Sequence, residues 1–199
     1  MQITSETVKK LRDKTGVGMM DCKKALEETG GDFDKAVEIL RKKGIEVANK
    51  RSGRAASQGT VASYIHMGGK IGVLLEVNCE SDFVAKSDDF NNFVKDVAMQ
   101  IAAASPDWVT RDEVPEHVLS KEKEILKEQA LKTGKPEKVL DKIVEGKLSK
   151  FYSERCLMDQ HFVKDQEKTI KQLLDELMAK TGEKCLIRRF ARYQVGEEL

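Results

Sequence analysis

The 199-residue chain has few aromatic residues and no long apolar run. Aromatic residues make up 6% of the sequence and charged residues 35%, which favours exposed helices and a modest core over a large β-sandwich. No apolar run approaches the length of about 20 residues that a membrane-spanning helix needs. The N-terminus lacks the basic-then-apolar pattern of a secretion signal. We therefore expect a soluble cytoplasmic protein.

The net charge is +1, so the chain lacks the strong basic field that is typical of nucleic-acid-binding proteins. Its four cysteines are far apart and form no CxxC pair, a spacing that favours neither a zinc site nor a disulfide framework. No GxxxxGK loop or GxSxG elbow is present. Cys79 and His66 could be imagined as a nucleophile and base, but a thiol that ends an apolar strand is usually packed. We expect no metal, no cofactor and no enzymatic chemistry.

Residues 1–53 are predicted to form a compact unit of three helices. Thr4 is placed to cap the first helix, Gly16 to end it, and Asp32 to cap the third. The expected helices are 4–15, 19–29 and 33–44, with Gly44 as the last stop signal. Short linkers make the helices neighbours, and the small core predicts a separately mobile module.

A basic cluster follows the third helix, made of Lys42, Lys43, Lys50, Arg51 and Arg54. One interpretation is a phosphate-binding patch for RNA. The other is a solvated linker, because no aromatic residues are interleaved with these charges.

Residues 54–199 are predicted to form an α+β core with a three-stranded antiparallel sheet. The expected strands are 59–66, 70–79 and 185–195, and Gly68-Gly69 makes the turn of a hairpin. The expected helices are 88–104, 115–133 with Gly134 as its stop, one that begins near Pro136, and one capped by Asp165. Both faces of the sheet are partly apolar, which indicates a partner or a second copy of the chain.

The stretch 76–86 joins the second strand to the helix that follows it, which places Asp82 and Phe83 on the bend between them. One interpretation buries Phe83 and Val84 in the core, where most aromatic residues lie. The other makes Phe83 a wedge for a partner, with Asp82 as a polar contact beside it. The spacing of the residues does not distinguish between the two.

Two long motifs carry a resemblance to a known family. Residues 11–26 read LRDKTGVGMMDCKKAL and residues 76–85 read EVNCESDFVA. In this order they resemble the two signatures of the bacterial elongation factor Ts family. The family's central signature usually reads Thr-Asp-Phe-Val, and Ser81 keeps the hydroxyl group of that threonine.

The resemblance implies a guanine-nucleotide exchange factor for elongation factor Tu, with a ubiquitin-associated-like three-helix module before the α+β core. It implies that the segment Ser81, Asp82, Phe83 and Val84 enters the partner's GTPase domain and dislodges Mg²⁺ from bound GDP. It also implies that Arg12, Met19 and Met20 contact another helix of that domain.

The chain is similar to the short members of the family, because it holds one copy of the Tyr64-Ile65-His66 hairpin region. The resemblance implies a homodimer paired through the sheets, with His66 of the second copy as a further contact to the partner. In some relatives a cysteine of the last strand bridges the subunits, whereas this chain has Ala191 at the matching position. The rival hypothesis is an RNA-contacting adaptor that uses the basic cluster.

Overall fold

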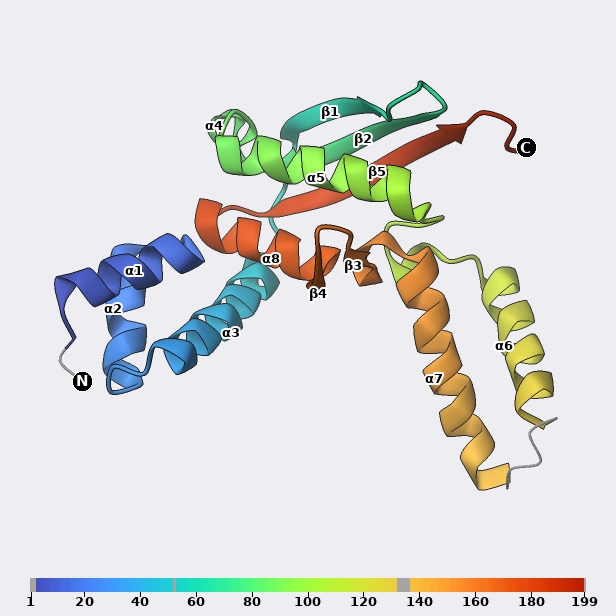
Figure 1. Cartoon of the computed structure of the whole chain (residues 1–199), viewed down its shortest axis with the longest axis horizontal. Coiled ribbons are helices and arrows are strands. Elements are labelled where there is room, and N and C mark those ends of the chain that lie inside the picture. The colour runs from blue at the N-terminus through green and yellow to red at the C-terminus, as the bar shows by residue number, and fades with distance from the viewer. Residues whose placement is uncertain (1–2, 52, 132–136, 199) are drawn as a thin grey trace. The chain divides into compact units, whose positions relative to one another are not determined.

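The computed structural model describes residues 3–51, 53–131 and 137–198, with side chains at 3–44, 53–131 and 140–198 (Figure 1). The chain divides into two compact units. The first holds Met1–Val61, Glu76–Val94 and Gln172–Ile187, and the second holds Ala62–Leu75, Lys95–Lys171 and Arg188–Leu199. Each unit draws on distant parts of the chain, and the boundary at residue 53 stays a prediction.

Three helices open the chain, as the cap signals predict. They are α1 (Ser5–Thr15), α2 (Met19–Glu28) and α3 (Phe33–Arg51). The Thr4 side chain accepts a hydrogen bond from the backbone N–H of Thr7, and Gly16 ends α1 in the left-handed conformation with φ 68°. Their shared core consists of small and aliphatic side chains, namely Val8, Leu11, Cys22, Ala25, Leu26, Ala36 and Leu40.

The prediction that Gly44 ends the third helix is wrong, because α3 continues to Arg51. Gly44 is buried, and a Cβ atom at this position would lie 3.3 Å from the Cβ of Ala179. The glycine is therefore explained by close packing against α8 (Ile170–Thr181). A stop signal and a packing glycine look the same in sequence.

The three predicted strands are confirmed and form one antiparallel sheet in the order β1-β2-β5. They are β1 (Gln58–Ile65), β2 (Ile71–Cys79) and β5 (Cys185–Gln194). The hairpin turn is closed by a hydrogen bond from the backbone N–H of Gly69 to the carbonyl of His66, at 2.9 Å. Alternate residues of β2 are buried, namely Val73, Leu75, Val77 and Cys79, as expected for a strand with one face in the core.

The remaining helices include α4 (Asp82–Ala85) and α5 (Asp88–Ala104), which follow β2 directly. The helices α6 (Glu116–Leu131) and α7 (Glu137–Arg155) form an antiparallel hairpin (Figure 1), with Leu126, Ala130 and Val144 between them. Two single 3₁₀ turns, η1 (Arg111–Glu113) and η2 (Leu157–Asp159), flank this hairpin. The predicted helix boundaries at Thr133, Gly134 and Pro136 lie outside the described residues.

The prediction that Asp165 caps a helix is wrong. The residues form a small hairpin of β3 (His161–Phe162) and β4 (Asp165–Thr169), and α8 begins only at Ile170. The Asp165 carboxylate accepts a hydrogen bond from the backbone N–H of Glu167 at 3.1 Å, as in a turn. The side chain of Asp165 thus makes the local bond that its sequence suggests, but in a turn rather than at a helix start.

Candidate partner-binding site at the Ser81–Ala85 turn

The stretch after β2 folds into the bend that the sequence predicts. Ser81 is extended, with φ −125° and ψ 157°, and its hydroxyl oxygen accepts a hydrogen bond from the backbone N–H of Val84. Ser81 is thus the N-cap of the four-residue helix α4. We call residues 81–85 the Ser81 turn.

Phe83 and Val84 have opposite environments on this turn. Phe83 is 81% exposed, whereas Val84 is 4% exposed. The interpretation that both residues enter the core is therefore wrong for Phe83 and right for Val84. A large apolar side chain held in water at the tip of a short helix is available for contact with another molecule.

Asp82 is also exposed, and it has a partner within the chain. Its carboxylate accepts a hydrogen bond from the Lys86 ammonium at 2.8 Å, one helical turn away. This hydrogen bond lowers the pKa of Asp82 and raises the pKa of Lys86. The carboxylate therefore stays ionised beside Phe83, where it can contact a polar group of a partner.

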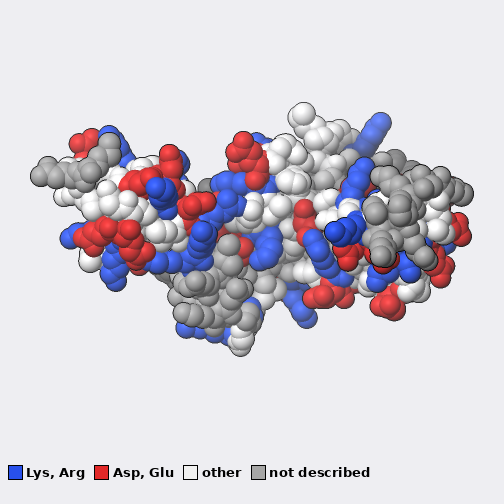
Figure 2. Space-filling model, turned by 90° about the horizontal axis from the view of Figure 1, so that it is seen from below, with Lys and Arg blue, Asp and Glu red and all other residues white. Residues whose placement is uncertain are grey.

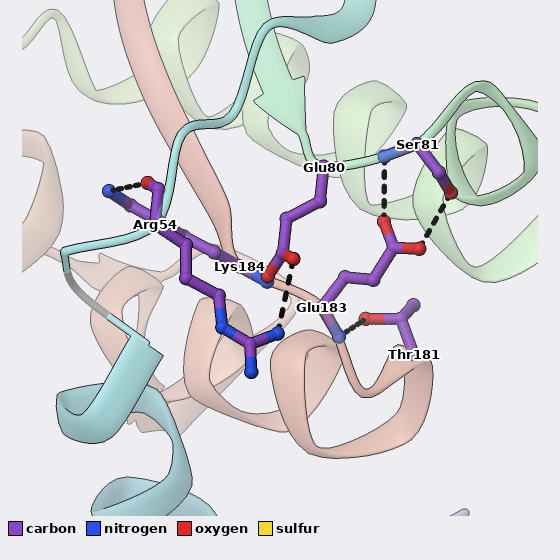
Figure 3. Close-up of polar contacts among 6 residues, drawn as sticks. All are labelled: Arg54, Glu80, Ser81, Thr181, Glu183 and Lys184. Atoms are coloured by element: carbon purple, nitrogen blue, oxygen red, sulfur yellow. Dashed lines mark hydrogen bonds and ion pairs between the residues drawn. The ribbon is translucent and has the colours of Figure 1, made fainter.

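Two glutamates hold the start of the turn (Figure 3). The Glu183 carboxylate accepts hydrogen bonds from the backbone N–H of Ser81 at 2.9 Å and from its hydroxyl at 2.6 Å. The Glu80 carboxylate accepts from the backbone N–H of Lys184 at 2.6 Å and from Arg54 at 3.2 Å. Glu183 lies 102 residues from Ser81 in the chain, so no local sequence pattern marks it.

The residues predicted to contact the partner from the N-terminal helices are also exposed. Arg12 lies in the last turn of α1, and Met19 and Met20 open α2 with exposed fractions of 42% and 64%. They belong to the same compact unit as Phe83. Two exposed methionines are adaptable contact residues.

His66 lies in the other unit, next to the hairpin turn. It is exposed, and its Nδ1 atom lies 3.1 Å from the hydroxyl oxygen of Tyr64. Among the side chains that the structure describes, no group of three or more His, Cys, Asp and Glu residues could hold a metal ion. The imidazole of His66 thus lies within hydrogen-bonding distance of a tyrosine of β1.

All four cysteines are free and buried. Burial raises the pKa of the Cys79 thiol, that of Cys156 to about 11 and that of Cys185 to about 12. Cys79 donates a hydrogen bond to the carbonyl oxygen of Ser81 at 3.1 Å. A buried thiol with a raised pKa has little thiolate at neutral pH, which argues against the nucleophile hypothesis.

The basic cluster is partly neutralised where its side chains are described. Lys43 lies 2.8 Å from a Glu28 carboxylate oxygen, and Arg54 lies 3.2 Å from one of Glu80. The side chains of Lys50 and Arg51 lie outside the description. Figure 2 shows basic and acidic side chains interspersed over the face that it presents, which does not resemble a continuous phosphate-binding patch.

Among the helices that the structure describes, none is long and apolar enough to cross a membrane.

Residues 4–197 match the family described as Elongation factor TS. The chain is 60% identical over its whole length to the elongation factor Ts of Syntrophus aciditrophicus, covering 99% of that protein. It is 58% identical to that of Thermoanaerobacter sp. strain X514 over 98% of the chain and 96% of the relative. It is also 58% identical to the elongation factor Ts of Geobacter sulfurreducens, over the whole chain and 92% of the relative. The chain therefore belongs to the elongation factor Ts family, whose members act in the elongation phase of protein synthesis.

Proposed function

We propose that the protein is a guanine-nucleotide exchange factor for elongation factor Tu and acts in the cytoplasm. In this proposal Asp82 and Phe83 enter the partner's GTPase domain and dislodge the Mg²⁺ that accompanies bound GDP. The observation that carries the proposal is the 81% exposure of Phe83 within a motif that matches the family's central signature. Ser81 and Val84 hold the backbone of the same segment.

The physical basis is linkage between two ligands of one partner. Mg²⁺ bridges phosphate oxygens and neutralises their charge, so its loss weakens nucleotide binding. A factor that prefers the nucleotide-free partner lowers nucleotide affinity by the same coupling with which nucleotide lowers its own affinity. No covalent bond is made or broken, so the protein is not an enzyme in the chemical sense and needs no cofactor.

The N-terminal helices supply a second contact in this proposal. Residues 1–53 are the partner-binding module, in which Arg12, Met19 and Met20 meet another helix of the GTPase domain. Their exposure supports this role. Two separated contacts on one partner let the factor bind GDP-loaded elongation factor Tu before Phe83 is inserted.

We also propose that residues 54–199 mediate pairing of two copies through the sheet. Ile65, Leu74, Tyr193 and Val195 are all large apolar residues that are more than half exposed, on neighbouring strands or directly after one. A Cβ atom on Gly72 would lie 3.2 Å from a methyl group of Ile65, so this glycine leaves room for the side chain across the strands. In the dimer, His66 of the second copy adds a contact to the partner.

The test is release of fluorescent GDP from purified elongation factor Tu in excess unlabelled GDP. We expect a tenth of an equivalent of this protein to accelerate release many-fold. Phe83→Ala is expected to lose at least about tenfold of that acceleration, or about 1.4 kcal/mol. The matched control is Leu131→Ala, which removes an apolar side chain of 63% exposure from α6.

A second arm examines the role of Mg²⁺. When EDTA has already removed the ion, release is fast and the added protein should accelerate it far less than in Mg²⁺ buffer. Absence of acceleration by folded wild-type protein would contradict the exchange function. Equal acceleration with and without Mg²⁺ would contradict the displacement of the ion but not exchange itself. Salt-dependent binding of RNA instead would favour the adaptor hypothesis.

A further inference from the structure

The Glu183 carboxylate makes a bidentate hydrogen-bonding contact with Ser81 at the start of the Ser81 turn (Figure 3). One carboxylate oxygen accepts from the backbone N–H of Ser81 at 2.9 Å, and the other accepts from its hydroxyl at 2.6 Å. Glu183 lies between the end of α8 and the start of β5. Hydrogen bonds to an ionised acceptor are about twice as strong as those between neutral groups, so this contact is a firm one.

The contact uses the donors of Ser81 that the turn itself leaves free. The hydroxyl oxygen of Ser81 accepts from the backbone N–H of Val84 at 3.3 Å, and its carbonyl accepts from that of Ala85 at 3.2 Å. Cys79 donates to the same carbonyl at 3.1 Å. Each polar group of Ser81 is therefore engaged, and its conformation is fixed from both sides.

The dipeptides Glu80-Ser81 and Glu183-Lys184 are joined by two hydrogen bonds of opposite direction. Glu80 accepts from the backbone N–H of Lys184 at 2.6 Å, while Glu183 accepts from that of Ser81. Arg54 bonds to the other oxygen of Glu80 at 3.2 Å, and the Lys184 ammonium donates to the carbonyl of Arg54 at 2.8 Å. Hydrogen bonds thus join the end of β2 to the start of β5 immediately before α4.

Such a support is needed because α4 has four residues. A helix of one turn is unstable by itself, since its formation fixes several backbone angles for very few hydrogen bonds. Phe83 contributes little to holding it, being 81% exposed. Burial of Val84 and the contacts of Ser81 help to keep α4 formed, together with the hydrogen bonds that Lys86 donates to the Asp82 carboxylate and that Ser87 donates to the carbonyl of Val84.

We propose that Glu183 is a positioning residue for nucleotide exchange, holding the Ser81 turn in the conformation that presents Phe83 to the partner. This inference rests on the proposed exchange function. Without the carboxylate, the turn adopts further conformations, and only the fraction that still presents Phe83 is competent. The apparent activity falls to that fraction of the wild-type value.

The test is a double-mutant cycle in the GDP-release assay, with wild type, Glu183→Ala, Phe83→Ala and the double variant. We expect Glu183→Ala to reduce the acceleration about tenfold, as loss of roughly 1.4 kcal/mol of charged hydrogen bonding predicts. In the Phe83→Ala background, Glu183→Ala should cost less than twofold, because it acts through Phe83. Equal losses in both backgrounds, or a loss below twofold in wild type, would overturn the proposal.

The matched control is Thr181→Val, which removes the hydroxyl that accepts from the backbone N–H of Glu183 at 3.4 Å and leaves the carboxylate in place. Its exchange should stay within about twofold of wild type. If Glu183→Ala does not fold, the cycle is run with Glu183→Gln, whose amide accepts at one atom only, with an expected loss of about threefold.

Amide hydrogen exchange of the free protein separates this inference from the proposed function. Glu183→Ala should speed exchange at residues 81–86 by at least about tenfold, with little change in α1. If the wild-type protein does not accelerate GDP release from elongation factor Tu, but Glu183→Ala shows this local loss of protection, the exchange function is rejected. The contact of Glu183 with the turn then still stands. Unchanged protection at residues 81–86 would reject the positioning role whatever the exchange assay shows.

Discussion

Phe83 and Val84 are adjacent in the chain but differ in burial, so truncating each to alanine should give opposite results. Full burial of a phenylalanine side chain is worth up to about 3 kcal/mol, and at 81% exposure about a fifth of that, or about 0.6 kcal/mol, is at stake in Phe83→Ala. Val84 is 4% exposed. Removing two methyl groups there should cost about 2 kcal/mol, including the cavity that is left.

Urea unfolding monitored by circular dichroism measures the stability loss of each variant. With an m-value of about 2 kcal/mol/M, Val84→Ala should lower the midpoint by about 1 M and Phe83→Ala by about 0.3 M or less. The exchange assay should rank the variants the other way, with Phe83→Ala the more impaired when both are folded. A midpoint shift for Phe83→Ala as large as that for Val84→Ala would refute the argument, because it would make Phe83 a core residue.

Three further predictions concern the rest of the molecule. Gly59 has φ +142°, and a Cβ atom there would lie 2.1 Å from the carbonyl oxygen of Val77. Gly59→Ala should therefore lower the melting temperature far more than Gly30→Ala. A Cβ atom on Gly30 meets no atom within 4 Å, so that variant carries only the cost of about 1–2 kcal/mol for φ +62°. Burial raises the pKa of Cys185 from 9.0 to about 12, so the unfolded state loses this proton first, stability should fall as pH rises from 9 to 12, and Cys185→Ala should flatten that slope in urea midpoints. Ile65→Asp should convert a dimer to a monomer in light scattering, and a wild-type monomer at micromolar concentration would contradict pairing through the sheet.

The elements with strong local signals were predicted well. The cap at Thr4, the hairpin at Gly68-Gly69 and the helix α5 all have punctuation and periodicity within a few residues of one another. The structure confirms them because local preference and tertiary packing agree at these places. The bend at Asp82 and Phe83 followed from the same kind of signal, a strand followed closely by a helix start, whereas the exposure of Phe83 did not follow from it.

The errors arose where one residue type serves two purposes. Gly44 has the appearance of a helix stop, but it is a glycine because Ala179 lies against it. Asp165 has the appearance of a helix cap, but its carboxylate closes a turn. In both cases the competing explanation depends on residues far away or on the exact conformation of the next few, neither of which a local pattern contains.

Glu183 could not be found from the sequence for a stronger reason. Its role depends on the pairing of β5 beside β2, which brings residue 183 next to residue 81. This pairing also explains why the motif around Phe83 is longer than the contact it would make. Phe83 must be free of the host, yet its neighbours must be held tightly, and a single turn of helix provides too few bonds of its own. Ser81 resolves this conflict with one short side chain, because its hydroxyl accepts from Val84 on one side and donates to Glu183 on the other. Both bonds need a hydroxyl group at position 81, and alanine in its place would lose both of them.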